Sequence, residues 1–304
     1  MFKIKYNITK GLNEVVLYND ERATYLVLDL NHGGRTKSLI VQGVEIISDI
    51  KNPVYPISFA GAVLFPFVNR LQRGRYTHDG TLYQLSCNEK TGENAIHGLL
   101  ADKTFKLIEQ YRDESQARVT ITHHSAGRME GYPFPFDLNL VYSLDSDGVK
   151  LHVQISNRGK QSMPFTLGWH PYFALPAPDS SSLTINGLNT YKTDYKGIVV
   201  GSKDFKNNSA INLKDAELDD AFKVDAKMVQ LKTSRYSLHM RSSETENYMQ
   251  VYLPKNSKHI AIEPMTGVSN SFNNKIGLQF IEPGSNYSLQ WDLRIYDVTP
   301  ESNL

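Results

Sequence analysis

The sequence predicts an all-β protein, an antiparallel sandwich or barrel, from three observations. Apolar and polar residues alternate with a period of two in several segments, as they do in half-buried strands. The chain contains 17 Tyr and 13 Phe, and aromatic residues suit pleated surfaces better than helices. Clusters of Gly, Asn, Asp and Pro separate short apolar segments from end to end, which is typical of sandwiches and barrels.

The alternation predicts a series of strands. In chain order, alternating apolar residues mark strands at residues 26–30, 119–121, 138–144, 151–155 and 287–295. Asp147 and Gly148 mark a turn between the third and fourth of these. No segment has the periodicity of an amphipathic helix of three turns.

Two polar segments are expected to be loops. Pro176–Ser182 has the composition of a surface loop, and 201–219 is predicted to be a long loop without structure of its own. No repeat or charge block divides the chain, so residues 1–304 are expected to form a single domain.

Composition excludes several classes of protein. The chain of 304 residues is long enough to bury a large core, and 33 basic residues balance 32 acidic ones. Nothing therefore favours nucleic acid or an anionic membrane as a partner. The most apolar stretch, Phe59–Val68, is about ten residues long, which is too short to span a bilayer, and the N-terminus lacks the apolar segment of a signal peptide. We expect a cytoplasmic protein, and the oligomeric state stays open.

Common catalytic and metal-binding motifs are absent from the sequence. It contains no GxxxxGK[ST], GxGxxG, GxSxG or HExxH segment. His123 and His124 are adjacent in an expected strand, so their side chains should point to opposite faces and cannot bind one metal ion. Cys87 is the only cysteine in the sequence, so no internal disulfide can form, and we expect it to be a buried, unreactive thiol. We expect no metal and no cofactor.

The segment Phe165–Pro171 contains a first candidate for chemistry. Alternation places Phe165, Leu167 and Trp169 on one face, which we expect to be core. Thr166, Gly168 and His170 share the other face. Apart from the imidazole, its side chains are small or absent, which suits a cleft for a ligand.

Ile260–Pro264 shows the same geometry. Ile260 and Ile262 should pack inward, while Ala261 and Glu263 face the other way. His170 and Glu263 each precede a proline, which favours extended backbone and is expected to end the sheet ladder just beyond. Taken alone, each residue is more typical of a structural role, and alternation does not show that the two converge.

Five segments, in order along residues 60–270, together resemble the aldose 1-epimerase (galactose mutarotase) family. Phe65–Tyr76 (FPFVNRLQRGRY) is similar to the family's FPxxNRxxxGxF segment, and 94–98 (NAIHG) to its N-x-[LI]-H-G. The remaining three similarities are 168–173 (GWHPYF) to the HPYF segment, 219–222 (DDAF) to DxxF, and 262–266 (IEPMT) to the EP segment.

The resemblance implies a fold, an activity and site residues. The fold would be a large antiparallel β-sandwich, the galactose mutarotase-like supersandwich, with a sugar such as galactose, glucose or a related aldose in a groove on one sheet. The reaction would be interconversion of anomers without cofactor or metal. By position, His170 would be the general acid and Glu263 the general base. The substrate-binding residues implied in the same way are Asn69, Arg70, His97 and Asp219.

The sequence departs from the family pattern at three places. Leu99 stands where the family usually has a second Gly, Trp169 precedes the candidate acid, and residues 265–271 replace a segment that usually contains proline and aspartate. These departures leave the acid and base in place and are expected to bear on sugar specificity.

Two other functions stay open. A hexose-6-phosphate 1-epimerase would need a phosphate site, and Arg70, Arg73 and Arg75 lie close together in the sequence. A non-catalytic sugar-binding protein could share the fold, but it would be expected to lack the acid or the base. The chemistry favours an epimerase, because ring opening needs a proton donor and an acceptor, and an imidazole that titrates near neutrality beside a carboxylate suits both roles.

Overall fold

A computed structural model describes residues 1–90, 92–205 and 209–300, and strands dominate it. The only α-helix among these residues is α1 (Ser271–Asn274), and Pro178–Ser180 forms a short 3₁₀ turn. The prediction of an all-β protein is confirmed.

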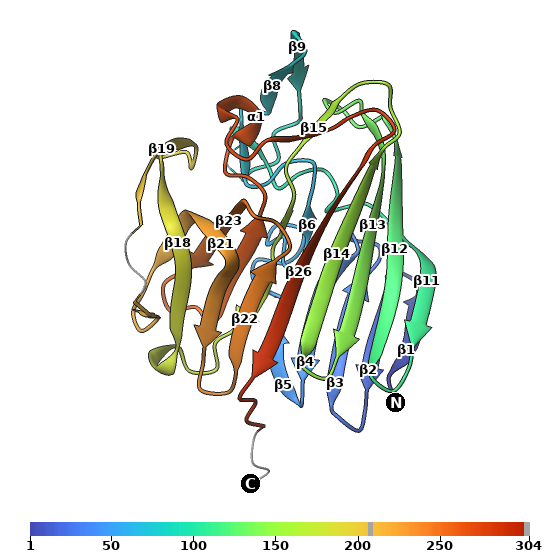
Figure 1. The fold of residues 1–304 in the computed structure, drawn as a ribbon, viewed down its shortest axis with the longest axis vertical. Coiled ribbons are helices and arrows are strands. Elements are labelled where there is room, and N and C mark those ends of the chain that lie inside the picture. The colour runs from blue at the N-terminus through green and yellow to red at the C-terminus, as the bar shows by residue number, and fades with distance from the viewer. Residues whose placement is uncertain (91, 206–208, 301–304) are drawn as a thin grey trace.

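One layer of the sandwich lies at the front of Figure 1. Each strand in it pairs with the next in antiparallel fashion. In spatial order these strands are β11 (Lys106–Arg112), β12 (Gln116–Ala126), β13 (Pro135–Asp145), β14 (Gly148–Asn157), β26 (Asn286–Tyr296) and β22 (Ser237–Ser242).

The second layer lies behind the first and is also antiparallel (Figure 1). Its spatial order is β1 (Lys3–Thr9), β2 (Leu12–Asn19), β3 (Thr24–Asp29), β4 (Arg35–Val41), β5 (Val44–Ile47), β17 (Tyr172–Ala174), β24 (His259–Met265) and β23 (Asn247–Leu253).

Two long strands connect the layers. Residues 218–224 of β21 (Leu218–Lys232) pair with β23 in the second layer, while residues 229–232 pair with β22 in the first. β18 (Ser182–Thr193) follows β21 along both parts, with register shifts between them. A strand that shifts register in this way bends, and the bend carries the sheet from one layer to the other.

The prediction of a long structureless loop at 201–219 is wrong in its first part, at residues 211–212, and at its end, where β21 begins. β19 (Val199–Asp204) pairs with β18, and the short strand β20 (Ile211–Asn212) does so too. Residues 206–208 of that predicted loop lie outside the described part of the chain. The polar composition suggested a loop, but an edge hairpin that is exposed to water can form strands with few apolar residues.

Eight short strands complete the fold. They are β6 (Val63–Leu64), β7 (Arg70–Gln72), β8 (Arg75–His78), β9 (Thr81–Gln84), β10 (Asn94–Ile96), β15 (Met163–Phe165), β16 (Gly168–Trp169) and β25 (Gln279–Ile281). Two of them, β6 and β16, pair within the large sheet. β7 pairs with β10, an arrangement that brings two of the family-like segments side by side.

A single large cluster of buried apolar side chains fills the space between the layers and extends from Phe2 to Ile295. Phe165, Leu167 and Trp169 belong to it and are fully buried, as alternation predicted. The ring of Trp169 stacks on that of Trp291 with 6.5 Å between the centroids. The five predicted strands are all present, and their alternating apolar residues point into this core.

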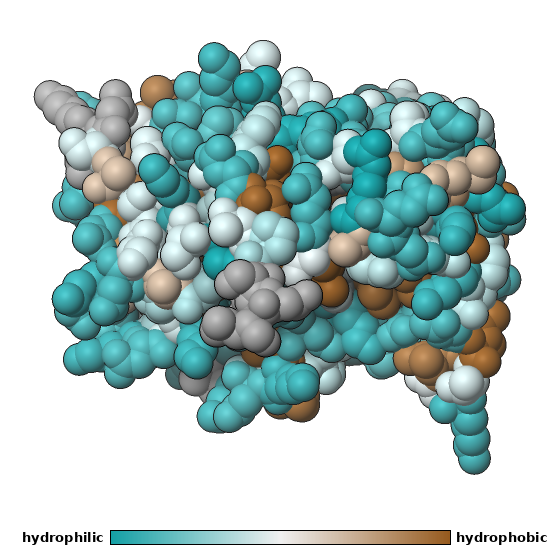
Figure 2. Space-filling view, turned by 90° about the horizontal axis from the view of Figure 1, so that it is seen from below, coloured by the Kyte–Doolittle hydropathy of each residue, from teal (hydrophilic) through white to brown (hydrophobic). Residues whose placement is uncertain are grey.

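The surface is largely hydrophilic on the face that Figure 2 shows, with hydrophobic residues in separate groups. His124 pairs across strands with Asp137, and His123 contacts the backbone oxygen of Thr104, so the two imidazoles face apart as predicted. Among the described residues, no helix is long and apolar enough to cross a membrane.

The prediction that Cys87 is buried is wrong. Its side chain is exposed, because it lies in an irregular segment after β9 and not within a strand that packs on the core.

Candidate functional site

All six residues that the resemblance singled out line one cavity of about 380 Å³. The cavity lies on the face of the second layer that points away from the core, and its volume falls within the range of small-molecule sites. The six are Asn69, Arg70, His97, His170, Asp219 and Glu263.

His170 lies in the two-residue link between β16 and β17. Its backbone nitrogen donates a hydrogen bond to the oxygen of Ala62, and its oxygen accepts one from the nitrogen of Gly61. Only 4 % of His170 is exposed, and the ring lies parallel to that of Tyr172 with 5.1 Å between centroids. Main-chain bonds and a stacked ring therefore hold the imidazole at the cavity wall.

Glu263 comes from the middle of β24, beside Gln250 on β23. The prediction that the ladder ends after Glu263 is wrong, because β24 continues through Pro264 to Met265. The nitrogen of Ile262 donates to the oxygen of Pro171, and bonding sides alternate along a strand, so the nitrogen of Pro264 points to the β16 side, opposite Trp169. The ladder on the other side, between β24 and β23, therefore does not need an N–H group at Pro264.

The expected bare face beside His170 is only partly present. A Cβ atom added to Gly168 would lie 2.8 Å from a side-chain carbon of Val68 and 3.2 Å from one of Met265, so other side chains cover this glycine. Thr166 is fully buried, and its hydroxyl accepts a hydrogen bond from the nitrogen of Val68. The cavity therefore begins at His170, and a small apolar cluster fills the space above Gly168.

His170 and Glu263 form the most buried pair of titratable groups in the cavity. The Nε2 atom of His170 lies 3.4 Å from the Oε1 atom of Glu263, and the side chains are 5 % and 3 % exposed. Burial lowers the pKa of His170 to about 4. Burial also raises the pKa of Glu263 well above its usual value, and the carboxyl group of Asp219 raises it further.

These shifts correct the expectation that the imidazole titrates near neutrality. Low-dielectric surroundings disfavour both charged forms, so the pair holds its proton on the carboxyl group and leaves the imidazole neutral. Two groups that share one proton across the neutral range can donate at one atom and accept at another.

A two-stranded ribbon of β7 and β10 brings Asn69, Arg70 and His97 to the cavity, while Asp219 comes from β21. Arg70 is opposite Ile96 in this ribbon, and the nitrogen of His97 donates to the oxygen of Asn69. Asn69 and His97 both adopt left-handed backbone conformations, with φ of 49° and 60°. Such conformations are uncommon in residues other than glycine and concentrate at functional sites.

A chain of amide and carboxylate groups crosses the floor of the cavity. The Nδ2 atom of Asn69 donates to Oε1 of Gln250 at 3.3 Å, and Nε2 of Gln250 donates to Oδ1 of Asp219 at 2.7 Å. Burial raises the pKa of Asp219, and the positive charge of Arg70 opposes that shift. These bonds fix the orientation of three polar side chains before a ligand arrives.

Gln250, Tyr172 and Phe59 also line the cavity, although the sequence analysis gave them no role in the site. Tyr172 stands in the family-like segment 168–173, next to the candidate acid. Gln250 had a local signal, because it is a polar residue at the centre of an otherwise apolar strand, NYMQVYL. Phe59 lacked one, since it precedes the first motif in an irregular segment. Its ring packs against His97 with 4.8 Å between centroids, and its φ of 49° is left-handed.

His97 sits between two rings. Its centroid is 4.8 Å from that of Phe59 and 4.9 Å from that of His170. Burial lowers the pKa of His97 well below its usual value, and the nearby His170 and Arg70 lower it further. A neutral imidazole at this position can donate or accept a hydrogen bond without carrying charge.

The tertiary structure brings together one group of possible metal ligands, which the sequence had not suggested. Ligand atoms of His97, His170 and Glu263 lie within 4.8 Å of one another. These residue types serve equally in proton transfer, so the expectation of a metal-independent protein stays a prediction.

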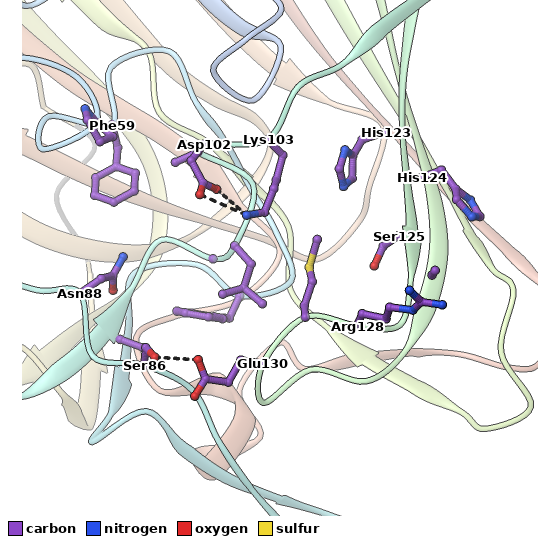
Figure 3. Close-up of a pocket in the computed structure, with 18 of the residues that line it drawn as sticks. Phe59, Ser86, Asn88, Asp102, Lys103, His123, His124, Ser125, Arg128 and Glu130 are labelled. Atoms are coloured by element: carbon purple, nitrogen blue, oxygen red, sulfur yellow. Dashed lines mark hydrogen bonds and ion pairs between the residues drawn. The ribbon is translucent and has the colours of Figure 1, made fainter.

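A larger cavity of about 770 Å³ lies on the other side of Phe59, which borders both cavities. Figure 3 shows Phe59 and Asn88 on one side of it, with His123, His124 and Arg128 on the other. Leu99 lines this second cavity and not the one that contains His170. The departures at Leu99, Trp169 and residues 265–271 therefore leave the lining of the candidate sugar cavity unchanged.

A family model and several known proteins match this chain. A family model described as aldose 1-epimerase matches residues 15–294. An uncharacterized protein of Escherichia coli, YihR, is 27% identical over 273 residues, covering 86% of this chain and 87% of that protein. Galactose mutarotase of Bos taurus is 30% identical over 125 residues, covering 41% of this chain and 35% of that enzyme.

Solved structures show the same fold. A galactose mutarotase-like protein from Clostridium acetobutylicum has a TM-score of 0.87 at 19% identity, covering 98% of this chain and 99% of the other. Galactose 1-epimerase from Lactobacillus acidophilus has a TM-score of 0.78 at 17% identity, also covering 98% of this chain and 99% of the other. The expected galactose mutarotase-like sandwich is thereby confirmed.

Proposed function

Because the chain belongs to the aldose 1-epimerase family, we propose that it interconverts the α and β anomers of a free aldose by acid–base ring opening and reclosure. One observation carries the proposal: His170 and Glu263 lie 3.4 Å apart, both buried, at the wall of a cavity of sugar size. The substrate would be galactose, glucose or a related aldose, and no cofactor takes part.

The mechanism uses one proton that is shared by the pair. In ring opening, the protonated imidazole of His170 gives its proton to the ring oxygen, while the Glu263 carboxylate accepts the proton of the anomeric hydroxyl. The C1–O5 bond breaks, a carbonyl forms at C1, and the proton now resides on Glu263 with a neutral His170. Rotation about C1–C2 presents the other carbonyl face, and reclosure runs with the two roles reversed.

Burial favours the neutral state of the pair, so the proton must first pass from Glu263 to His170 to form the ionised pair. Ring opening then returns the pair to its neutral state, and the shifts of the two pKa values favour this return. Each positioned proton transfer typically contributes ~10²–10⁴-fold to the rate.

Four other residues would hold the sugar. Arg70 and His97 would bind oxygens near C1, where the guanidinium stabilises negative charge that develops on oxygen. Asp219 would accept a hydrogen bond from a ring hydroxyl, and Asn69 would orient Arg70 and Gln250 through the hydrogen bonds of its amide.

The charge of the cavity favours a free aldose over a hexose 6-phosphate. The Arg70 cation lies beside the carboxyl group of Asp219 in this cavity, so a phosphate dianion would meet no excess of positive charge. Arg73 and Arg75 are exposed and line neither this cavity nor its neighbour.

The test is polarimetry with freshly dissolved α-D-galactose, α-D-glucose and α-D-glucose 6-phosphate. We expect the protein to accelerate the mutarotation of a free hexose and to have little effect on the mutarotation of glucose 6-phosphate. Catalysis of the phosphate alone would favour the 6-phosphate epimerase. Saturable galactose binding without any acceleration would favour a sugar-binding protein. A cytoplasmic location and a single domain over residues 1–304 complete the proposal.

A further inference from the structure

The guanidinium group of Arg70 is held on several sides before any sugar binds. Its Nε atom donates to Oε1 of Glu89 at 2.6 Å, and its Nη1 atom lies 3.4 Å from Oδ1 of Asn69. The second oxygen of Glu89 accepts a hydrogen bond from Nδ2 of Asn94 at 2.9 Å. With the side chain of Glu89 only 13 % exposed, this ion pair is largely shielded from water.

Gly197 forms another side of this enclosure. A Cβ atom added there would lie 2.5 Å from Nη1 of Arg70 and 2.8 Å from its Cζ atom, so the glycine backbone lies directly against the guanidinium plane. No real Cβ atom fits at such distances, and one of the two groups would have to move.

The turn that carries Gly197 is itself fixed. This turn, residues 194–197, lies between β18 and β19. The nitrogen of Gly197 donates to the oxygen of Asp194, and the hydroxyl of Ser269 donates to the oxygen of Gly197 at 2.7 Å. Lys196 in the same turn forms an ion pair of 2.7 Å with Glu93. A turn tied at several points is a firm support for the group that packs on it.

Arg70 matters for the chemistry because, in the described part of the chain, no other arginine or lysine lines the cavity. Its charge lowers the pKa values of Glu263 and Asp219 against the raising effect of burial. Moving the guanidinium away would weaken both its contact with sugar oxygens and its effect on the base.

We propose that Gly197 and Glu89 are positioning residues of the sugar site: the glycine backbone and the carboxylate together hold the Arg70 guanidinium in the orientation that the substrate needs. The inference rests on the proposed epimerase function for its kinetic consequences, but the placement of Arg70 can be measured without it. Neither residue contacts the His170–Glu263 pair in the hydrogen bonds and ion pairs of the described residues.

The experiment compares Gly197→Ala with Gly284→Ala. Both glycines have φ of 72°, so both substitutions carry the same backbone strain, but a Cβ atom at Gly284 meets nothing within 4 Å. We expect Gly197→Ala to lower kcat/KM for galactose at least ~10-fold, since an error of about 1 Å in placement can cost ~10²-fold. Gly284→Ala should stay within about 2-fold of the wild type.

A second pair of variants tests the carboxylate. In the wild type, one carboxylate oxygen of Glu89 accepts from Arg70 and the other accepts from Asn94. The amide of Glu89→Gln has only one oxygen, so one of these two hydrogen bonds is lost. Glu246→Gln is the matched control, since it breaks an exposed ion pair of the same 2.6 Å length with Lys223. We expect a loss of several-fold for the first variant and no change for the second.

Two readouts separate positioning from loss of folding. The alkaline limb of the pH–rate profile should move to higher pH in Gly197→Ala, because a displaced cation no longer lowers the pKa of Glu263. The Nε–H resonance of Arg70, assigned with Arg70→Lys, should be protected from exchange in the wild type and in Gly284→Ala but not in Gly197→Ala.

The outcomes are distinguishable. An unchanged rate, pH profile and Nε–H resonance in Gly197→Ala would overturn the positioning role, as would equal losses in Gly284→Ala. If the wild type accelerates no aldose, the proposed function fails, and the arginine resonance still decides whether Gly197 and Glu89 hold Arg70.

Discussion

The Nε2 atom of His170 lies 3.4 Å from the Oε1 atom of Glu263, with both side chains buried at one wall of a cavity. At this distance a small movement of either side chain changes the contact between the two atoms and so bears on which group holds the shared proton. Burial disfavours the charge on each group, so the environment and the distance together suit a proton that moves between them through a sugar.

The first prediction concerns this pair. Glu263→Gln keeps the shape of the side chain and removes the base, while His170→Asn removes the acid. We expect each to lower turnover at least ~10²-fold. The double variant should be scarcely slower than the poorer single variant, because residues that act as a unit are strongly non-additive. Polarimetry on variants with native circular dichroism provides the measurement, and a near-normal rate for Glu263→Gln would reject the assignment.

The second prediction is the pH dependence of the rate. Catalysis needs one shared proton on the His170–Glu263 pair. Activity should fall at low pH, where His170 is protonated while Glu263 keeps its proton, and at high pH, where Glu263 loses its proton and neither group can donate. The pKa of His170 is about 4, which places the acidic limb below the usual range of an imidazole. A kcat/KM profile from pH 3.5 to 10 tests this, and an acidic limb near pH 6.5 would contradict it.

The third prediction is a gain in stability that accompanies loss of activity. Glu263 has a raised pKa in the folded state, so its contribution to stability is fully present below pH 4.5 and is lost as pH rises through the folded-state pKa. A Gln cannot ionise and avoids this loss. The difference in Tm between Glu263→Gln and the wild type should therefore grow from pH 4.5 to pH 8.

The control for that measurement is Glu114→Gln, which replaces an exposed carboxylate. Its Tm should follow that of the wild type across the same pH range. If the Tm difference of Glu263→Gln stays constant with pH, then burial does not raise the pKa of Glu263 in solution.

The fourth prediction is that Arg70→Lys is not a conservative change. Arg70 uses its Nε atom to bind Glu89 while its other nitrogens stay directed toward Asn69 and the cavity. An ammonium group cannot serve these directions at once. We expect turnover to fall by about 10-fold to about 10²-fold, given that loss of one stabilising donor typically costs 10²–10³-fold. Kinetics close to wild type would make Arg70 a structural residue.

The fifth prediction is metal independence. His97, His170 and Glu263 could bind a divalent ion, but the proton-transfer mechanism needs none. Dialysis against a strong chelator, followed by assay in metal-free buffer, should leave the rate of mutarotation unchanged. A large loss that one divalent ion restores would replace the acid–base mechanism by one that depends on a metal.

Local pattern was enough to predict much of the fold. Alternation placed Phe165, Leu167 and Trp169 in the core and His170 on the opposite face, because successive side chains of any strand point to opposite sides. The same rule identified Glu263 opposite Ile262. Residue type and composition were less reliable guides, and the predictions from them were wrong at Cys87 and at residues 201–204. A short irregular segment or an exposed edge strand has no buried face to produce an alternating pattern.

The site was predicted only in part. Motif resemblance named six of its residues, and they line one cavity. Glu89 and Gly197 were not found, because their importance comes from contact with a side chain far away in the sequence, and nothing near them in the chain records that contact.

The sequence by itself determined the residue types at the site and the strands that carry them. Only the tertiary structure decided that His170 and Glu263 face each other, that His170 is neutral at physiological pH, and that a glycine turn packs on Arg70. The reason is physical: side-chain direction follows from the local backbone, whereas desolvation and charge–charge interactions depend on every group within several ångströms, and those groups come from distant parts of the chain.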